Sequence, residues 1–462
     1  MFVLTSNKDV PLYKQLYNQI KERVLSGQLC ADFKLPSIRD LADELSVSRN
    51  TVEGAYLELT AEGYIYSKPR SGYFISALDQ EAPLFLPHSP RKHDRLPEPP
   101  SLFKYDFHPA RLDPDSFPAT LWRKCFVDCL HENSRELSHY STPQGEWGLR
   151  CSIQKYLEHS RGVICDPDQI VICAGLQHSL SVVAHVLKSN HSVVAVENPG
   201  YPLPRSVFRN HSFKIVPIPV VPSGLDVDAL KASSSTIAYV TPSHQQPLGY
   251  VMPVANRLKL IEWAESIGKF VIEDDYDSEL RYHGKPIPSL QGLRPDGNII
   301  YLGTFSKILS PALRASYLVL PQSLLPIYHS LFKDYLSSVS LLEQRTLAKF
   351  MEEGHWERHV RRMRTAYKNK HNSLLGAVEH HFGTQAIVVG QGAGLHIVMQ
   401  LHNTAHSEAE IIARAQQKGI RLIPFSNTYA SGKPSVTSLM LGFGGMAANE
   451  IDQGIALLSR IC

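Results

Sequence analysis

The stretch Ile299-Ile300-Tyr301-Leu302-Gly303-Thr304-Phe305-Ser306-Lys307 decides the fold that we expect. Its apolar first half, closed by a glycine, is typical of a buried strand. A lysine flanked by the hydroxyls of Thr304 and Ser306 follows the strand, and Arg314 comes seven residues after the lysine. An amine beside hydroxyls and a guanidinium suits a Schiff base next to a phosphate anion. We therefore expect Lys307 to mark a ligand site.

Further apolar runs alternate with helical segments on both sides of this stretch. With the first half of this stretch, the apolar runs are 170–173, 193–196, 237–240, 270–272, 299–302 and 317–320. Such alternation predicts an α/β domain with a mostly parallel sheet covered by helices. Ligands collect at the carboxyl ends of the strands in sheets of this kind, so the residues just after each run are candidate site residues.

Two other strand ends carry suitable chemistry. Gly175 opens a helix with Leu176 and Gln177, and the free amides of a helix start can hold a phosphate. Asp274 places a carboxylate after 270–272. Together with Lys307 these groups meet the needs of pyridoxal phosphate: an amine for the aldehyde, a carboxylate for the pyridinium nitrogen, and donors for the phosphate.

The first eighty residues show a different pattern. Leu12, Leu16, Ile20 and Val24 recur at helical spacing between Pro11 and Gly27, and a second helix is expected from residue 38 to 45. After the turn 46–48, a third helix runs from Arg49 to about Glu62, with Val52, Ala55, Tyr56 and Leu59 facing inward. This arrangement is a helix-turn-helix. Residues 64–75 are expected to form two short strands around a basic tip, as in a DNA-binding wing.

The basic and polar residues of this region fall where a winged helix meets DNA, although its bulk charge is balanced. The candidates are Ser37, Arg39, Ser48, Arg49, Asn50, Thr51, Lys68, Arg70 and Gly72. The pieces Leu35-Pro36-Ser37-Ile38-Arg39-Asp40-Leu41-Ala42, Val47-Ser48-Arg49-Asn50-Thr51-Val52, Ala55-Tyr56 and Glu62-Gly63-Tyr64 resemble the GntR-type winged helix. The resemblance covers residues 11–76 and implies double-stranded DNA as a partner.

The larger part of the chain resembles fold-type-I aminotransferases, and its fusion to a GntR-like head resembles the MocR family of bacterial regulators. Matching pieces include Tyr140-Ser141-Thr142-Pro143-Gln144-Gly145, Glu197-Asn198-Pro199-Gly200-Tyr201, Thr241-Pro242-Ser243-His244-Gln245 and Glu273-Asp274-Asp275-Tyr276-Asp277-Ser278-Glu279. The implied fold is a large parallel-sheet subdomain, about 150–335, with a smaller α+β subdomain, 336–462, in a body spanning 105–462.

The resemblance also implies roles for individual residues. Lys307 would be the Schiff-base lysine, Asp274 the partner of the pyridine nitrogen and Tyr276 a contact to the ring hydroxyl. Tyr201 would stack on the ring. The phosphate would be held by Gly175, Leu176, Gln177, Thr304, Ser306 and Arg314. A head-to-tail homodimer is implied, in which Tyr140 reaches the neighbouring subunit's phosphate and two heads read two DNA half-sites.

One departure from the enzymes concerns the substrate carboxylate. Aminotransferases of this type keep an arginine in a C-terminal stretch reading roughly Leu-Arg-Leu-Gly-Phe, and here Ser438-Leu439-Met440-Leu441-Gly442-Phe443 stands in its place. A thioether cannot replace a bidentate charged clamp. GABA-responsive members use a second arginine soon after the Pro-Gly-Tyr motif, but Arg205 has a different offset. The profile resembles PdxR-type regulators of vitamin B6 synthesis, which implies pyridoxal phosphate itself as the signal.

Two alternatives stay open: a regulator responding to GABA or another amino compound, and a working aminotransferase that also binds DNA.

Composition limits the domain organisation, the metal content and the compartment that we expect. The Pro-rich residues 77–104, with an apolar patch at 83–87, predict a tether between a 1–76 head and the body. The seven cysteines form neither a disulfide ladder nor a metal-site spacing, so we expect free thiols and no metal. Without a signal peptide or a membrane-length apolar stretch, the expected compartment is the cytoplasm.

Overall fold

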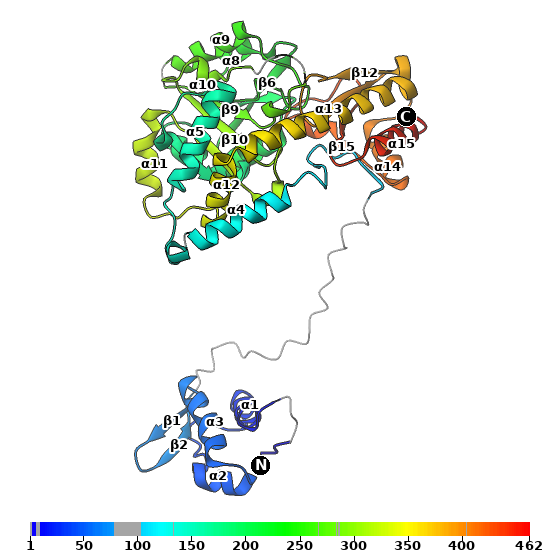
Figure 1. The fold of residues 1–462 in the computed structure, drawn as a ribbon. Coiled ribbons are helices and arrows are strands. Elements are labelled where there is room, and N and C mark those ends of the chain that lie inside the picture. Colours follow the sequence, from blue (N-terminus) through cyan, green and yellow to red (C-terminus); the bar gives the residue numbers. More distant parts are fainter. Residues whose placement is uncertain are drawn as a thin grey trace. The chain divides into compact units, whose positions relative to one another are not determined.

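The computed structural model describes residues 2–5, 10–77, 103–132, 134–266, 268–282, 284, 287–402 and 404–462. The chain divides into two compact units, residues 1–99 and 100–462, each described here by itself (Figure 1). Most of the expected tether, residues 78–102 with the patch at 83–87, lies outside the described residues. Among the described helices, none has the length and apolar character that a membrane crossing requires.

Within residues 10–77, three helices precede a two-stranded antiparallel wing: α1 (Leu12–Leu25), α2 (Ile38–Leu45), α3 (Arg49–Ala61), β1 (Ile65–Lys68) and β2 (Gly72–Ile75). The inward face of α3 is as predicted, because Val52, Ala55, Tyr56 and Leu59 are each fully buried. Leu12 lies in the expected helix but is 37% exposed. Leu12 is the first residue of α1, and the helix reaches the core only from Leu16 onward.

Side-chain caps begin the two helices that form the helix-turn-helix. The Ser37 hydroxyl accepts a hydrogen bond from the Asp40 amide (3.1 Å), and the Ser48 hydroxyl accepts one from the Thr51 amide (3.3 Å). Ser46, in the left-handed conformation at φ 55°, ends α2. Each cap satisfies an amide that the helix start leaves free, and typically stabilises a helix by about 1 kcal/mol. The turn between the helices is therefore encoded locally.

The second unit is built on an eight-stranded sheet, counted within the described residues. In sheet order the strands are β4 (Ile170–Cys173), β11 (Ser316–Val319), β10 (Ile299–Thr304), β9 (Phe270–Asp275), β8 (Ile237–Val240), β5 (Val193–Asn198), β6 (Lys214–Val221) and β7 (Gly224–Leu225). Strands β10, β9, β8, β5 and β6 run parallel, whereas β11 and β7 run antiparallel to their neighbours. This confirms the predicted mostly parallel sheet.

Helices cover both faces of the sheet because successive strand residues point to opposite sides. In β10, Ile300 and Leu302 pack in one apolar cluster, while Ile299 and Tyr301 pack in clusters of the other face. One face is covered by α6 (Leu176–Lys188), α7 (Pro202–Asn210) and α11 (Leu325–Phe332). The other is covered by α5 (Trp147–Arg161), α8 (Val227–Ala232), α9 (Val254–Glu265), α10 (Leu290–Leu293), α12 (Leu341–Glu352) and the start of α13 (His355–Phe382). Helix α4 (Ala119–Glu132) packs on α12.

Helix α13 runs from the large subdomain into the smaller one (Figure 1). The smaller subdomain holds a four-stranded antiparallel sheet in the order β12 (Ala386–Val389), β13 (His396–Leu401), β16 (Ser438–Gly442) and β15 (Ile423–Pro424). Helices α14 (Glu408–Gln417) and α15 (Ala448–Ser459) and the parallel pair β14 (Ile420–Arg421) with β3 (Tyr105–Asp106) complete it. The expected division into a parallel-sheet subdomain and a smaller α+β subdomain is observed.

Candidate functional site

Lys307 lies in the turn that follows β10, half-buried at the carboxyl edge of the sheet. The turn is fixed by the Ser306 amide, which donates to the Thr304 hydroxyl (3.1 Å), and by Phe305, which packs on Trp356. Burial lowers the pKa of the Lys307 amine, and the charges of Asp277 and Asp274 act in the opposite direction. A lysine whose pKa is lowered has more of the neutral amine that attacks an aldehyde.

Asp274 stands beside this lysine at the end of the neighbouring strand β9, where its backbone is paired with Leu302. Its carboxylate is 3% exposed and accepts a short hydrogen bond from the Tyr239 hydroxyl of β8. Burial raises the pKa of Asp274 to about 7 with the help of neighbouring carboxylates, although the hydrogen bond from Tyr239 acts in the opposite direction. No cation pairs with Asp274 among the described residues. A cationic ring nitrogen brought to this carboxylate would favour its ionised form.

Gly175 and Arg314 form a cradle at the start of α6. Gly175 has φ 78°, and a Cβ atom there would lie 2.4 Å from an Nη atom of Arg314. That nitrogen donates to the Ala174 carbonyl oxygen (3.3 Å). The amides of Leu176 and Gln177, in the first turn of α6, lie at the same helix start. A helix start with a guanidinium beside it suits an anion such as phosphate.

The three predicted tyrosines differ in their exposure and in their contacts. Tyr201, the N-cap of α7, is 38% exposed, and burial with the nearby charge of Asp274 raises the pKa of its hydroxyl. The Tyr276 hydroxyl donates to Gln246 Oε1 (2.8 Å). Tyr140 is 84% exposed and makes no hydrogen bond to any other described residue. Its expected role on a neighbouring subunit stays a prediction.

Met440 faces this site from β16. Its sulfur lies 3.9 Å from Gln246 Nε2, and the side chain is 5% exposed in an apolar cluster with Leu248, Val398 and Phe425. Arg205 is engaged elsewhere: its guanidinium donates to the backbone carbonyls of Asn427 and Thr428. Arg205 thus ties α7 to the smaller subdomain. Positions 440 and 205 are the two that the sequence analysis compared with the carboxylate-binding arginines of the family.

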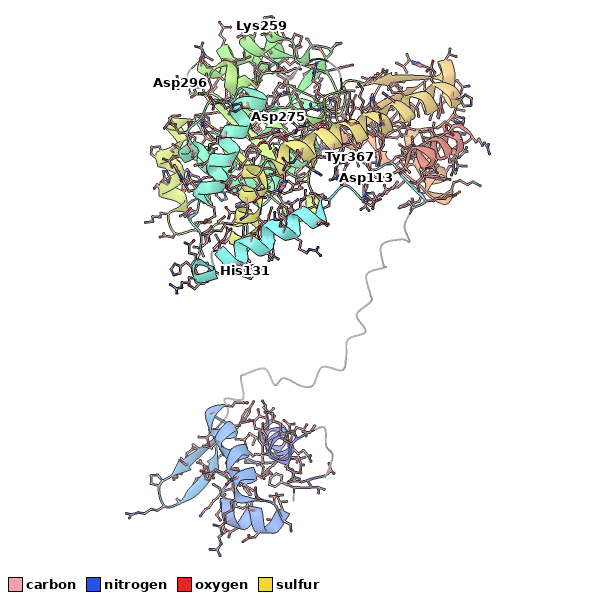
Figure 2. All side chains as sticks on the ribbon, in the orientation of Figure 1. Asp113, His131, Lys259, Asp275, Asp296 and Tyr367 are labelled. Carbon is pink, nitrogen blue, oxygen red and sulfur yellow. The ribbon has the colours of Figure 1, made fainter. Side chains whose placement is uncertain are left out.

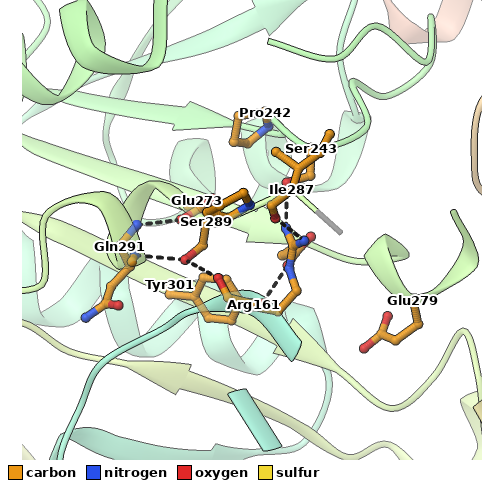
Figure 3. Close-up of polar contacts among 12 residues, drawn as sticks. Arg161, Pro242, Ser243, Glu273, Glu279, Ile287, Ser289, Gln291 and Tyr301 are labelled. Carbon is orange, nitrogen blue, oxygen red and sulfur yellow. Dashed lines mark hydrogen bonds and ion pairs between the residues drawn. The ribbon is translucent and has the colours of Figure 1, made fainter. Parts of the chain in front are cut away.

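A buried polar network connects the loops that carry the site residues. Arg161, at the end of α5, pairs with Asp275 (2.5 Å) and donates to the Ser243 hydroxyl (2.7 Å) and to the Ile287 carbonyl (Figure 3). The Tyr301 hydroxyl donates to the same Asp275 carboxylate (2.6 Å). Asp275 lies inside the larger unit (Figure 2). Through Ser243, the network holds the segment that follows β8, and the next residue of that segment is His244.

Sequence reasoning missed several residues that contact the predicted site. Tyr239, His244, Gln246 and Asp277 were not singled out, although His244 and Asp277 stand in quoted motifs. Gln246 follows the Thr241-Pro242-Ser243-His244-Gln245 piece directly, and Asp277 follows Tyr276 in the acidic cluster. Their partners lie on other strands, so only the tertiary fold brings them together.

On the head, the predicted DNA-binding residues lie at two helix starts and on the wing, with Ser37 and Arg39 exposed at the beginning of α2. Arg49, Asn50 and Ser48 are exposed at the beginning of α3, as a base-reading helix requires. Arg70 is exposed at the wing tip with φ 61°. Lys68 is less free: its ammonium lies 3.9 Å from Asp32 and over the ring of Phe74 (4.7 Å).

Comparisons with known proteins agree with these two units. The family model of class I and II aminotransferases matches residues 112–456, and that of the gntR family of bacterial regulatory proteins matches residues 12–75. The solved structure of LysN, an alpha-aminoadipate aminotransferase from Thermus thermophilus complexed with N-(5'-phosphopyridoxyl)-L-leucine, is 25% identical. It covers 77% of this chain and 91% of its own, with a TM-score of 0.69.

Relatives share the whole architecture. The HTH-type transcriptional regulator YdeL of Bacillus subtilis is 40% identical over 98% of this chain and 97% of its own. The probable rhizopine catabolism regulatory protein MocR of Rhizobium meliloti is 32% identical over 98% and 94%. The pyridoxine biosynthesis transcriptional regulator PdxR of Corynebacterium glutamicum is 29% identical over 96% and 94%. The chain belongs to the MocR family of transcriptional regulators, which join a GntR-type DNA-binding head to an aminotransferase-like body.

Proposed function

We propose that this regulator binds pyridoxal phosphate covalently at Lys307 and uses it as the signal that controls vitamin B6 synthesis genes. One observation carries the proposal. The residues that would hold the cofactor lie together at the carboxyl edge of the sheet, while the position expected to clamp a substrate carboxylate is the buried thioether of Met440.

The residues present fit the cofactor. Pyridoxal phosphate supplies, when bound, an aldehyde that condenses with a primary amine and a ring that absorbs visible light. The Gly175–Arg314 cradle, which a side chain at position 175 would fill, would hold the phosphate. Buried Asp274 would face the ring nitrogen, and Tyr201 would stack on the ring. Tyr276 would contact the ring hydroxyl. Thr304 and Ser306 flank the lysine and would add hydroxyl donors.

Sensing is favoured over turnover because amino-acid chemistry needs the substrate held for proton transfer. Neither Met440 nor Arg205 offers a free guanidinium for that purpose, since Arg205 is occupied by two backbone carbonyls. The PdxR relative is named as a regulator of pyridoxine biosynthesis, which supports the cofactor as the signal.

A regulator that responds to an amino compound is the second candidate. It is favoured by the MocR relative, which is named for rhizopine catabolism and is slightly more similar to this chain than PdxR. In either case we propose a head-to-tail homodimer that presents two heads to two DNA half-sites. The exposure of Tyr140 supports that arrangement because this side chain is free to reach a second subunit.

Absorbance spectroscopy tests the proposal. The wild-type protein mixed with pyridoxal phosphate should retain a visible absorption band after gel filtration. Lys307→Ala should lose the band, because it removes the amine that we propose to bond to the cofactor, while Lys259→Ala, which removes an exposed lysine of α9, should keep it. A retained band in Lys307→Ala, or none in the wild type, would contradict covalent binding at Lys307.

A further inference from the structure

A buried imidazole and a buried carboxylate lie next to the proposed ring-hydroxyl contact. His244 follows β8 and Asp277 follows β9, so both lie at the carboxyl edge of the sheet. Their side chains are 2% and 3% exposed, and His244 Nδ1 lies 2.9 Å from Asp277 Oδ2. The same nitrogen lies 3.0 Å from the Tyr276 hydroxyl oxygen. The Tyr276 hydroxyl therefore contacts both His244 and Gln246.

Two glycines fix the position of the imidazole ring. A Cβ atom at Gly394, which has φ 77°, would lie 2.4 Å from His244 Cε1 and 2.5 Å from Asp277 Oδ2. A Cβ atom at Gly249 would lie 3.1 Å from His244 Nε2. Gly394 belongs to the smaller subdomain and its amide donates to the Leu280 carbonyl (2.9 Å). A side chain at either position would collide with the imidazole, so the two glycines leave the space that the ring occupies.

The partners decide where the imidazole proton sits. An ionised Asp277 only accepts hydrogen bonds, so Nδ1 must carry the proton. Tyr276 donates its own proton to Gln246 Oε1 (2.8 Å), so its oxygen can receive part of the Nδ1–H bond. The other nitrogen, Nε2, is buried without an acceptor among the described residues, which agrees with its being unprotonated. The Tyr276 hydroxyl is thereby held between one donor and one acceptor.

We propose that His244 and Asp277 are positioning residues of the cofactor site: Asp277 orients the imidazole, and the imidazole with Gln246 fixes the Tyr276 hydroxyl for the ring hydroxyl of pyridoxal phosphate. The inference rests on the proposed function. His244 acts through Tyr276, so its effect on the cofactor depends on that hydroxyl. A carboxylate that accepts a hydrogen bond from an imidazole nitrogen fixes the orientation of the histidine in many other sites.

A double-mutant cycle tests this dependence. The dissociation constant of pyridoxal phosphate is measured by absorbance for wild type, His244→Ala, Tyr276→Phe and the double variant. Losing one hydrogen bond to a positioned group costs about tenfold in affinity, so His244→Ala should weaken binding by about that factor. In the Tyr276→Phe background the same change should weaken binding less than about twofold, because interacting residues are not additive.

Matched variants separate positioning from folding. His244→Asn should recover most of the affinity, since an amide nitrogen can take the place of Nδ1. Asp277→Asn should weaken binding as His244→Ala does, whereas Glu279→Gln should not, because that carboxylate accepts from Tyr156 rather than from His244. Thermal unfolding without the cofactor checks that each variant is folded. If His244→Ala does not fold, Asp277→Asn takes its place in the double-mutant cycle with Tyr276→Phe.

The outcomes are distinguishable. Equal losses in both Tyr276 backgrounds, or no loss at all, would overturn the positioning role while a normal wild-type band keeps the proposed function. A wild-type protein without any visible band would overturn the proposed function, and this inference with it.

Discussion

At position 440 an uncharged thioether touches a glutamine of the proposed cofactor site, and this contact is why we propose sensing rather than catalysis. Met440 packs with apolar neighbours, so the site offers no charge there for a carboxylate. Arg205 is the nearest basic candidate by sequence, but its guanidinium ties two parts of the body together.

Two basic residues of the wing should contribute unequally to DNA binding. Arg70 is exposed at the tip, whereas Lys68 is partly neutralised by Asp32. Arg70→Ala should weaken binding to random duplex and reduce the slope of log affinity against log salt by about 1, since one phosphate contact is lost. Lys68→Ala should change the slope less. Filter binding at several salt concentrations measures both.

The control for this comparison is Asp32→Asn, which frees Lys68 and should steepen the salt dependence. A smaller slope change for Arg70→Ala than for Lys68→Ala would contradict this reading of the wing.

At the scale of strands, the ends of β5 and β9 gather carboxyl groups inside the protein. Burial raises the pKa of Glu197, Glu273 and Asp274 to about 7. A carboxyl whose pKa is higher in the folded state adds stability at low pH and loses it as pH rises through the folded value. These strand ends therefore favour binding partners that carry positive charge.

Glu197→Gln tests this pH dependence in the cofactor-free protein. Its carboxylate accepts hydrogen bonds from Thr241 and Gln245 but has no cation beside it among the described residues. Lowering the pH from 8 to 6 should stabilise the wild type relative to the variant by about 1.4 kcal/mol in total, most of it below the folded pKa of about 7. Calorimetric melting of both proteins at each pH measures the difference. The buried histidines contribute equally to the pH dependence of both proteins, so their effect cancels in the comparison. If the difference in unfolding free energy between the two proteins is the same at pH 8 and pH 6, the pKa of Glu197 is not raised.

The sequence predicted the strands that are continuous apolar runs, each to within a few residues, but not β6. Its Pro217 and Pro219 disguise the pattern, and proline is tolerated there because β6 lies near the sheet's edge. The strands of the smaller subdomain were also missed, since several are too short to show a period. The lysine, carboxylate and cradle were predictable because each follows a strand in the chain. Tyr239 and His244 were not, because hydrogen bonds across strands depend on register.

At the scale of the whole molecule, a ligand in the body can regulate a head on DNA only if it binds two arrangements of the protein with different affinity. The linkage is reciprocal, so DNA that favours one arrangement must also change the affinity for the ligand. Pyridoxal phosphate is the ligand for which this body has a complete set of candidate contacts.

The most direct measurement is DNA affinity as a function of pyridoxal phosphate concentration, for wild type and Lys307→Ala. The probe is a duplex that the wild-type protein selects from a random pool, followed by fluorescence anisotropy. We predict that the cofactor changes the wild-type affinity at least about fivefold, the lower end of typical coupling, and leaves Lys307→Ala unchanged. The same shift in both proteins, or none in a wild type that carries the visible band, would contradict the account.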